Sequence, residues 1–284
     1  MRKWGLRNCT IGSRISDVSI CYRNLCRIKK KAVYINDITA YDFHLMRNNM
    51  TEYAESSLRL MLYGFGLFLE YFTGKNPCIQ ARLRWNGIET DKVWITGEEW
   101  SRLFDAADPM MRLVLALGGS MGLRRTEILT IKMSDISGNL LRVVGKGTGN
   151  GKIVTMEMSY PVTECLKPYL EWRDEIVTKY GDRSDGNLLI CPVKTNLGKP
   201  LSPTMLNQML CDLSDRTGIK WTLHSLRRLF CMTQVDAGID LETTSKMMRH
   251  SSKETTVNSY IKADPRKLHL ALAAVNNTFS AMAI

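Results

Sequence analysis

The strongest periodic pattern in the chain lies between residues 58 and 72. Apolar side chains recur there at spacings of three and four residues, which is typical of an amphipathic helix. They are Leu58, Met61, Leu62, Phe65, Phe68, Leu69 and Phe72. Gly74, Asn76 and Pro77 follow at once and are expected to end this helix. The stretch 86–91 then predicts a linker to a second domain.

A second group of elements begins after this linker. Thr96 and Glu99 have the spacing of a capping box and predict a helix that starts just after Thr96. Further helices are expected over about 108–118 and from the segment 122–129. The Ser-Pro pair at 202–203 is expected to cap another helix, and from there on the pattern is mainly helical.

Two β-rich runs interrupt the helical pattern. Residues 140–144 and 152–156 flank the Gly-rich turn 145–151 and predict a β-hairpin. The turn lacks the residue order of a phosphate-binding P-loop, because Lys152 is followed by isoleucine rather than by serine or threonine. The fold class that we expect is therefore mainly α with a small antiparallel β-sheet.

Basic residues are concentrated at the start of the chain. The formal net charge is +11, and the first 31 residues hold nine basic side chains against one acid, Asp17. The nine are Arg2, Lys3, Arg7, Arg14, Arg23, Arg27, Lys29, Lys30 and Lys31. Such an excess fits a polyanionic partner, although a solubilising tail would have the same composition. We therefore divide the chain into a basic N-terminal arm over 1–31, a helical domain over 32–90 and a second domain over 91–284.

Neither the apolar residues nor the cysteines indicate a membrane or a metal. The longest uncharged apolar stretch, roughly 60–69, is too short to span a bilayer, and no signal peptide is recognisable. We expect no membrane partner and a cytoplasmic location. The eight cysteines are expected to be reduced and mostly buried. Cys9, Cys21 and Cys26 would need a fourth ligand to bind zinc, and the nearby sequence offers none, so no metal is expected.

Four short segments carry arginine, lysine, histidine and tyrosine residues that together suit chemistry on a phosphodiester. Arginine offers a planar fork of N–H donors that matches phosphate oxygens, histidine can transfer protons near neutral pH, and a tyrosine hydroxyl can act as a nucleophile. No single segment is specific, but their order and spacing together are. The segments are Gly122–Leu129, Val144–Gly147, Leu223–Arg228 and Met248–Tyr260.

These segments resemble the conserved boxes of the tyrosine recombinase family, the phage-type integrases. The family's first box is a Gly-Leu-Arg turn that enters a helix, with an acid three residues after the arginine, and Arg124 and Glu127 match it. The second box is a lysine on a β-hairpin, which Lys146 matches, with Lys152 as the alternative. The resemblance is strong over about 93–265 and weak over the preceding helical region.

The third and fourth boxes match as well. The third is His-x-x-Arg, matched by His224 and Arg227, and the fourth is a histidine followed nine or ten residues later by the nucleophilic tyrosine, matched by His250 and Tyr260. Both histidines are expected to handle protons and to hydrogen-bond the phosphate. Because His224 and Arg227 stand three apart on a predicted helix, both are expected to project from one face.

The resemblance implies a role for the other residues too. Tyr260 is the expected nucleophile, and it needs cationic surroundings because a phenol has a pKa near about 10. Arg124 and Arg227 would bind the non-bridging oxygens, and Lys146 would protonate the leaving 5′ oxygen. Glu127 is expected to support Arg124 through a charge-assisted hydrogen bond.

Two positions depart from the family pattern. The family commonly has glycine before the second histidine, where this chain has Arg249. Arg249 could clash with a tight turn or add a phosphate contact. The family also often has histidine after the third-box arginine, where this chain has Arg228. Arg228 and Arg125 are expected to be solvated charges.

The resemblance implies a site-specific DNA recombinase or integrase with a two-domain architecture, a helical core-binding domain over 32–90 and an α/β catalytic domain over 91–284. Such an enzyme cuts and rejoins DNA through a 3′-phosphotyrosine and exchanges strands through a Holliday junction, with no cofactor, metal or ATP. The alternatives are a type IB topoisomerase and a non-enzymatic DNA-binding protein of the same fold.

The resemblance also implies the partners. Double-stranded DNA would lie in a C-shaped clamp, and a homotetramer would assemble on two DNA sites, with accessory DNA-bending proteins as further partners. The location would be the nucleoid of a prokaryotic host, and the source a virus or another mobile element. An apolar stripe near the C-terminus could dock on a neighbouring protomer or fold back on its own chain. The stripe consists of Leu268, Leu272, Val275 and Phe279.

Overall fold

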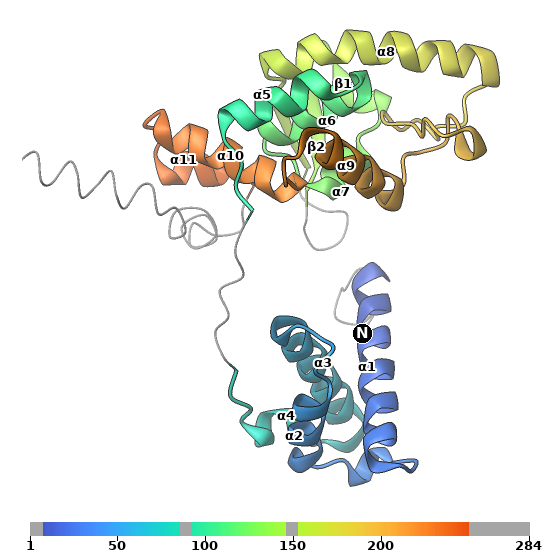
Figure 1. Cartoon of the computed structure of the whole chain (residues 1–284), viewed down its shortest axis with the longest axis vertical. Helices are drawn as coiled ribbons and strands as arrows, with labels where there is room; N and C mark the ends of the chain where they lie inside the picture. Colours follow the sequence, from blue (N-terminus) through green and yellow to red (C-terminus); the bar gives the residue numbers. More distant parts are fainter. Residues whose placement is uncertain (1–7, 86–92, 146–152, 250–284) are drawn as a thin grey trace, which may run out of the picture. The chain divides into compact units, whose positions relative to one another are not determined.

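The computed structural model describes residues 8–85, 93–145 and 153–249. The chain divides into two compact units, Met1–Asp91 and Lys92–Ile284, which we call the helical unit and the C-terminal unit. The division lies one residue from the predicted boundary at 90. The elements are mainly helices with one three-stranded antiparallel sheet (Figure 1), so the predicted fold class is confirmed. The predicted linker lies outside the described residues.

The helical unit is built around one long amphipathic helix. In the part of this unit that the structure describes, the α-helices are α1 (Asn8–Lys29), α2 (Ala40–Asn49), α3 (Glu55–Thr73) and α4 (Pro77–Ala81). The helix predicted over 58–72 is α3, and Gly74 ends it in the left-handed conformation at φ +71°. Leu62, Phe65 and Leu69 are fully or almost fully buried, whereas Phe72 at the end of the helix is exposed.

The predicted basic arm over residues 1–31 is wrong as a separate segment. Residues 8–29 form α1, which packs against α3, and Cys21 and Leu25 are fully buried in the core of the helical unit. The pKa of the Cys21 thiol is raised to about 12. Burial is the largest cause, and the nearby negative charge of Asp17 raises the pKa further. The sequence pattern did not predict this helix, because few of its positions are apolar and buried, and its basic and polar residues dominate the composition.

An ion pair between a partly exposed lysine and a buried aspartate connects the end of α1 to the start of α2. Lys29 Nζ lies 2.6 Å from Asp42 Oδ1, and the Asp42 side chain is fully buried. The second oxygen of Asp42 accepts hydrogen bonds from the backbone N–H of Thr39 at 2.9 Å and from its hydroxyl at 3.2 Å. Asp42 therefore closes the helix start and neutralises Lys29 at the same time.

Replacing Asp42 with alanine should destabilise the helical unit by about 2–3 kcal/mol, because the change leaves Lys29 without its carboxylate and removes the cap of α2. Urea unfolding of the intact chain would measure the shift in the transition of this unit. Asp37→Ala is the matched control, because Asp37 is an exposed acid of the same unit and should change stability little. Equal transitions for both variants would contradict this role of Asp42.

The C-terminal unit contains the remaining elements. Its described α-helices are α5 (Gly97–Ala106), α6 (Pro109–Gly119), α7 (Arg125–Thr130), α8 (Tyr160–Tyr180), α9 (Pro203–Thr217), α10 (Leu223–Asp236) and α11 (Leu241–Met247). The predicted capping box is present, since Thr96 Oγ1 accepts from the Glu99 backbone at 3.1 Å and Glu99 accepts from the Thr96 backbone at 2.8 Å. Ser202 caps α9 as predicted, by accepting from the Met205 backbone at 3.1 Å.

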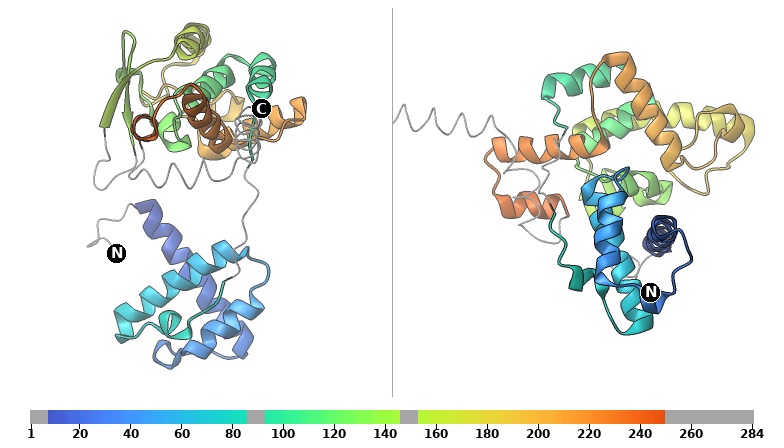
Figure 2. Two further views of the ribbon diagram at one scale, coloured as in Figure 1. Left: turned by 90° about the vertical axis from the view of Figure 1, so that its left-hand side faces the viewer. Right: turned by 60° about the horizontal axis from the view of Figure 1, so that its bottom comes forward.

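The sheet has the order β1-β2-β3, with antiparallel neighbours throughout. Its strands are β1 (Ile136–Ser137), β2 (Leu140–Val144) and β3 (Ile153–Glu157), so the predicted hairpin is confirmed. Leu141 pairs with Met156, and Val144 pairs with Ile153 beside the turn. The sheet stands at one side of the unit, and the helices gather beside it (Figure 2).

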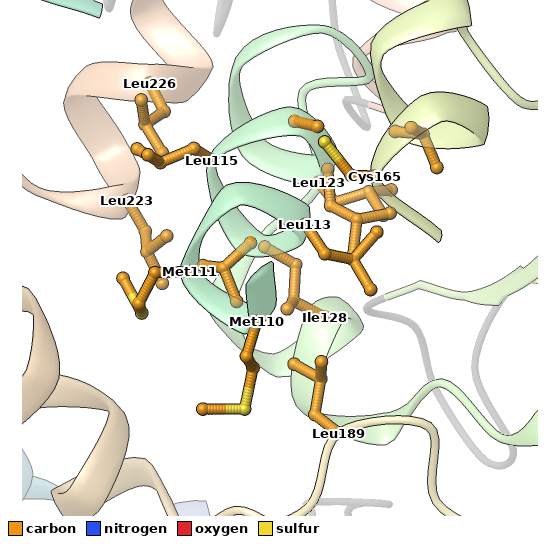
Figure 3. Packing of buried hydrophobic residues seen from close by; sticks show 14 of the residues in the cluster. Met110, Met111, Leu113, Leu115, Leu123, Ile128, Cys165, Leu189, Leu223 and Leu226 are labelled. Carbon is orange, nitrogen blue, oxygen red and sulfur yellow. The ribbon is translucent and has the colours of Figure 1, made fainter. Parts of the chain in front are cut away.

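Helix α6 lies at the centre of the core. It packs against α8 and α10, and Leu113, Val114 and Leu115 are completely buried. Figure 3 shows the surrounding side chains, which come from α6, α7, α8 and α10 and from the segment near Leu189. A Cβ at Gly118 would lie 2.8 Å from Leu226, so α6 and α10 approach closely there. This packing fixes α10, which carries two of the predicted site residues.

The cysteines at 21, 26, 78, 165, 191, 211 and 231 are free thiols, and those at 21, 165, 191 and 231 are buried. Within the same ranges, no helix is long and apolar enough to cross a membrane.

Candidate active site

The Gly122 turn places Arg124 at the start of α7. Gly122 has φ +61°, and a Cβ there would lie 2.6 Å from the ring of Phe230. Only glycine fits, because the left-handed conformation and the close ring both exclude a side chain. Leu123 is fully buried, and its N–H donates to Leu117 O at 3.1 Å. The turn is thus anchored on both sides, and Arg124 follows it with little freedom.

Glu127 holds Arg124 through two hydrogen bonds. Arg124 Nη1 donates to Glu127 Oε1 at 2.7 Å, and the Arg124 backbone N–H donates to Oε2 at 2.9 Å. The Glu127 side chain is almost completely buried. The contact that the sequence predicts between these residues is therefore present, and it fixes both the backbone and the guanidinium of Arg124.

Arg249 is the third member of this network. Its Nη2 lies 3.0 Å from Glu127 Oε2 and donates to Gly122 O at 3.0 Å, while its Nη1 donates to Met247 O at 2.9 Å. Its own carbonyl accepts from Arg124 Nη2 at 3.2 Å. Of the two expectations for Arg249, the clash is wrong, because the residue adopts φ +54° and turns its side chain inward.

The two arginines keep Glu127 ionised. Burial by itself would raise the pKa of Glu127, but the charge of Arg249 and the hydrogen bonds and charge of Arg124 bring that pKa below its usual value. Burial lowers the pKa of Arg249, and Glu127 opposes that effect. The cluster of two guanidinium groups and one carboxylate carries a net positive charge, which suits a site for a phosphate.

His224 and Arg227 lie in different surroundings although both belong to α10. His224 is exposed near the helix start, where Thr222 accepts from the Ser225 backbone at 3.0 Å. Arg227 is buried, and its two terminal nitrogens donate to Gly122 O and Met248 O. The two side chains differ in burial although they stand three positions apart on α10, because Arg227 packs into the interior while His224 lies at the surface.

Arg124 and His224 line one cavity of about 640 Å³. Its other lining residues come from α7, α9 and the start of α10, and they are Arg125, Thr126, Asn207, Leu210, Cys211, Ser214, Trp221, Thr222 and Leu223. Asn207 accepts from Arg125 Nη1 at 3.2 Å across this cavity wall. Sequence reasoning did not find Asn207 or Trp221, because neither lies in a recognisable motif.

The surroundings of His224 favour its neutral form. Partial burial lowers the pKa of His224, and the charges of Arg228, Arg227, Arg124 and Arg125 lower it further. A neutral imidazole can accept a proton or donate a hydrogen bond. A phosphate bound there would oppose the arginine charges and would favour protonation of His224.

Arg228 is not a solvated charge, and that expectation is wrong. Its Nη1 donates to Val93 O at 2.8 Å, and its guanidinium lies 5.6 Å from the centre of the Trp94 ring. Arg228 thus anchors the start of the C-terminal unit. Arg125 is exposed, as predicted.

Several predicted site residues lie outside the described residues. They are Lys146, with its alternative Lys152, His250 and Tyr260. The structure describes the chain up to Gly145, and again from Ile153 to Arg249. Across the described ranges, no group of three or more histidine, cysteine or acidic side chains is placed to hold a metal ion.

The comparison with known sequences defines the class of protein. The sequence model of the phage integrase family matches residues 93–267, which is more than half of the chain, so the chain belongs to the phage integrase family. It is 27% identical over 165 residues to tyrosine recombinase XerA of Thermococcus onnurineus, covering 57% of this chain and 55% of that protein. It is 30% identical over 149 residues to tyrosine recombinase XerC of Chlamydia muridarum, covering 51% and 44%.

Another relative is transposase A of transposon Tn554 from Staphylococcus aureus, 22% identical over 191 residues, covering 66% of this chain and 51% of that protein. The chain spans about half the length of these curated relatives. Among solved structures, the Tn1549 transposon integrase in complex with circular intermediate DNA has a TM-score of 0.68 at 18% identity, with 94% of each chain covered. A lambda integrase tetramer bound to a Holliday junction also has 0.68, at 18% identity, covering 90% and 72%. These structures share the fold.

Proposed function

We propose that this protein is a site-specific DNA recombinase that cuts and rejoins duplex DNA through a 3′-phosphotyrosine at Tyr260. The observation that supports it best is the cavity in which Arg124 and His224 meet, with Glu127 fixing Arg124 behind it. Membership of the phage integrase family supports the same reaction. The relatives named as tyrosine recombinases and as a transposase support a role in recombination within a mobile element.

In the proposed step, Tyr260 Oη attacks the scissile phosphorus and loses its proton. The bond from phosphorus to the 5′ oxygen breaks, and that oxygen takes a proton from Lys146. The products are a 3′-phosphotyrosine and a free 5′ hydroxyl. Attack by a 5′ hydroxyl on the phosphotyrosine reverses the step, so rejoining needs no other energy source.

The cationic residues stabilise the charge that builds up on the phosphate. Arg124 donates to the non-bridging oxygens from a guanidinium that Glu127 holds in place. His224 and His250 hydrogen-bond the phosphate and handle the tyrosine proton. The family resemblance implies that Arg227 binds the phosphate. Its contacts indicate a second role, because it connects the Gly122 turn to the end of α11.

The proposed assembly is a homotetramer on two double-stranded DNA sites that exchanges strands through a Holliday junction. The solved lambda integrase tetramer bound to a Holliday junction has the same fold and supports this proposal. We further propose that the helical unit contributes to DNA binding, that accessory DNA-bending proteins assist, and that the protein associates with the nucleoid in a prokaryotic cytoplasm. The stripe from Leu268 to Phe279 would link protomers or fold back on its own chain.

A covalent trapping experiment tests this function. The purified protein is incubated with a library of duplexes that have random sequence around a nick, because a short fragment beside the nick diffuses away after cleavage and prevents rejoining. SDS-resistant protein–DNA adducts are then selected, sequenced and digested to identify the attached peptide. We expect the adduct on Tyr260. A library that never becomes attached, while the protein still binds duplex DNA, would instead indicate a non-enzymatic DNA-binding protein.

A second assay separates the recombinase from a type IB topoisomerase. Two duplexes that carry the selected site are incubated together, and exchanged products are measured beside the relaxation of a supercoiled plasmid that carries it. A recombinase gives exchanged strands, whereas relaxation alone would favour the topoisomerase.

A further inference from the structure

Arg249 occupies a position where an arginine is costly. A residue with a side chain loses roughly 1–2 kcal/mol in the left-handed conformation, and Arg249 has φ +54°. Its guanidinium is also taken out of water, because only 4% of the side chain is exposed. Glycine would remove both costs. The side chain must therefore contribute interactions that offset them.

Those interactions connect three elements that lie far apart in the sequence. Arg249 stands 122 positions after Glu127, and it pairs with the oxygen that also accepts from the Arg124 backbone. Its contact with Gly122 O adds the turn before α7, and its contact with Met247 O adds the end of α11. In return, Arg124 Nη2 donates to the carbonyl of Arg249. The side chain of Arg249 thus contacts Glu127 and the Gly122 turn, and its backbone carbonyl accepts from the guanidinium of Arg124.

We propose that Arg249 is a positioning residue, which fixes the Glu127 carboxylate so that Arg124 is held in one orientation toward the cavity. The inference rests on the proposed function and deepens it, because Arg124 acts on the phosphate only in that function. Arg249 also directly precedes His250 and stands eleven positions before Tyr260. The same network therefore links the end of α11, where the chain leads to the nucleophile, to the arginine that binds the substrate.

The test compares Arg249→Gly and Arg249→Lys with the unchanged protein on a nicked duplex selected for adduct formation. Arg249→Gly relieves the left-handed conformation but removes the link, so single-turnover cleavage should fall about 100-fold while the affinity for the duplex changes little. Arg249→Lys keeps the charge but not the fork, and it should lose about tenfold. Asp185→Gly is the matched control, because Asp185 has φ +51° and is exposed in the same unit.

The pH profile separates positioning from a general loss of stability. Two charged groups contact Glu127, namely Arg124 at the start of α7 and Arg249 after the end of α11. A third, Arg227 of α10, donates to the Gly122 carbonyl, which also accepts from Arg249. Without Arg249, Glu127 should take up a proton at a higher pH. The acidic limb of the cleavage rate should therefore move to higher pH in Arg249→Gly. Titration of His224 affects the acidic limb equally in the unchanged protein and in Arg249→Gly, so it does not cause a difference between them. The shift should vanish when both proteins also carry Glu127→Gln.

The outcomes are distinct. Slower cleavage at unchanged affinity, partial rescue by lysine and a pH shift that depends on Glu127 support the proposal. Cleavage by Arg249→Gly that equals that of the unchanged protein at every pH overturns it, and so does a loss that follows thermal stability alone, without the pH shift. If the unchanged protein forms no adduct, the proposed function fails rather than this inference.

Discussion

Replacing Tyr260 with phenylalanine should abolish covalent attachment to DNA, with a loss of at least about 10⁴-fold in cleavage. Phenylalanine keeps the ring but lacks the hydroxyl, and only that oxygen can form the phosphotyrosine bond. The cations around the site cannot compensate, because they stabilise charge on a phosphate that no group attacks. SDS-resistant adduct formation on the selected nicked duplex measures the effect, and noncovalent binding should remain.

Tyr180→Phe is the matched control for this experiment. Tyr180 is half exposed at the end of α8 in the same unit, and its ring contacts Lys179. Its loss of a hydroxyl should leave adduct formation unchanged. Persistent attachment in Tyr260→Phe would mean that another residue is the nucleophile, and peptide mapping of that adduct would identify it.

Replacing Glu127 with alanine should have the largest effect on stability. The change leaves two guanidinium groups, those of Arg124 and Arg249, without the buried carboxylate that both share. Breaking a buried pair in this way costs about 3–5 kcal/mol. Cleavage should fall as well, because Arg124 loses the group that orients it. Urea unfolding of the C-terminal unit measures the first effect, and adduct formation measures the second. Glu98→Ala, an exposed acid of the same unit, should change neither.

The stability effect of Glu127 should depend on pH with a definite sign. Burial raises its pKa, but Arg249 and Arg124 together bring the folded value below that of the unfolded chain. Its contribution is therefore complete above the unfolded pKa of about 4.3, and it is lost as the pH falls through the lower folded value. The difference in unfolding free energy between the natural protein and Glu127→Gln should be constant near neutral pH and shrink in acid. A gap that widens in acid would contradict this assignment.

Local patterns in the sequence predicted much of the secondary structure. The apolar spacing of α3, the capping box before α5, the cap of α9 and the β2–β3 hairpin all appear where the sequence places them. Each depends on residues only a few positions apart, so the signal lies within one short segment. The order and spacing of the four boxes also predicted the family, because together they are specific although no single box is.

The same reasoning failed where the outcome depended on distant partners. Residues 8–29 have a basic surface, and their burial against α3 depends on only a few apolar positions such as Cys21 and Leu25. Arg228 was expected in solvent, but the chain entering the C-terminal unit brings Val93 and Trp94 to it. Charge and spacing along one segment do not reveal what a different segment will cover.

The Gly-Leu-Arg turn shows both sides of this division. The sequence by itself determined that Gly122 turns the chain, that Arg124 enters a helix and that Glu127 stands three positions later, within reach of it. Only the tertiary structure decided that Arg227 is buried against this turn and that Arg249 shares the carboxylate of Glu127. The physical reason is that an ion pair between residues 122 positions apart depends on how α7, α10 and α11 pack together. No local pattern in the sequence carries that information.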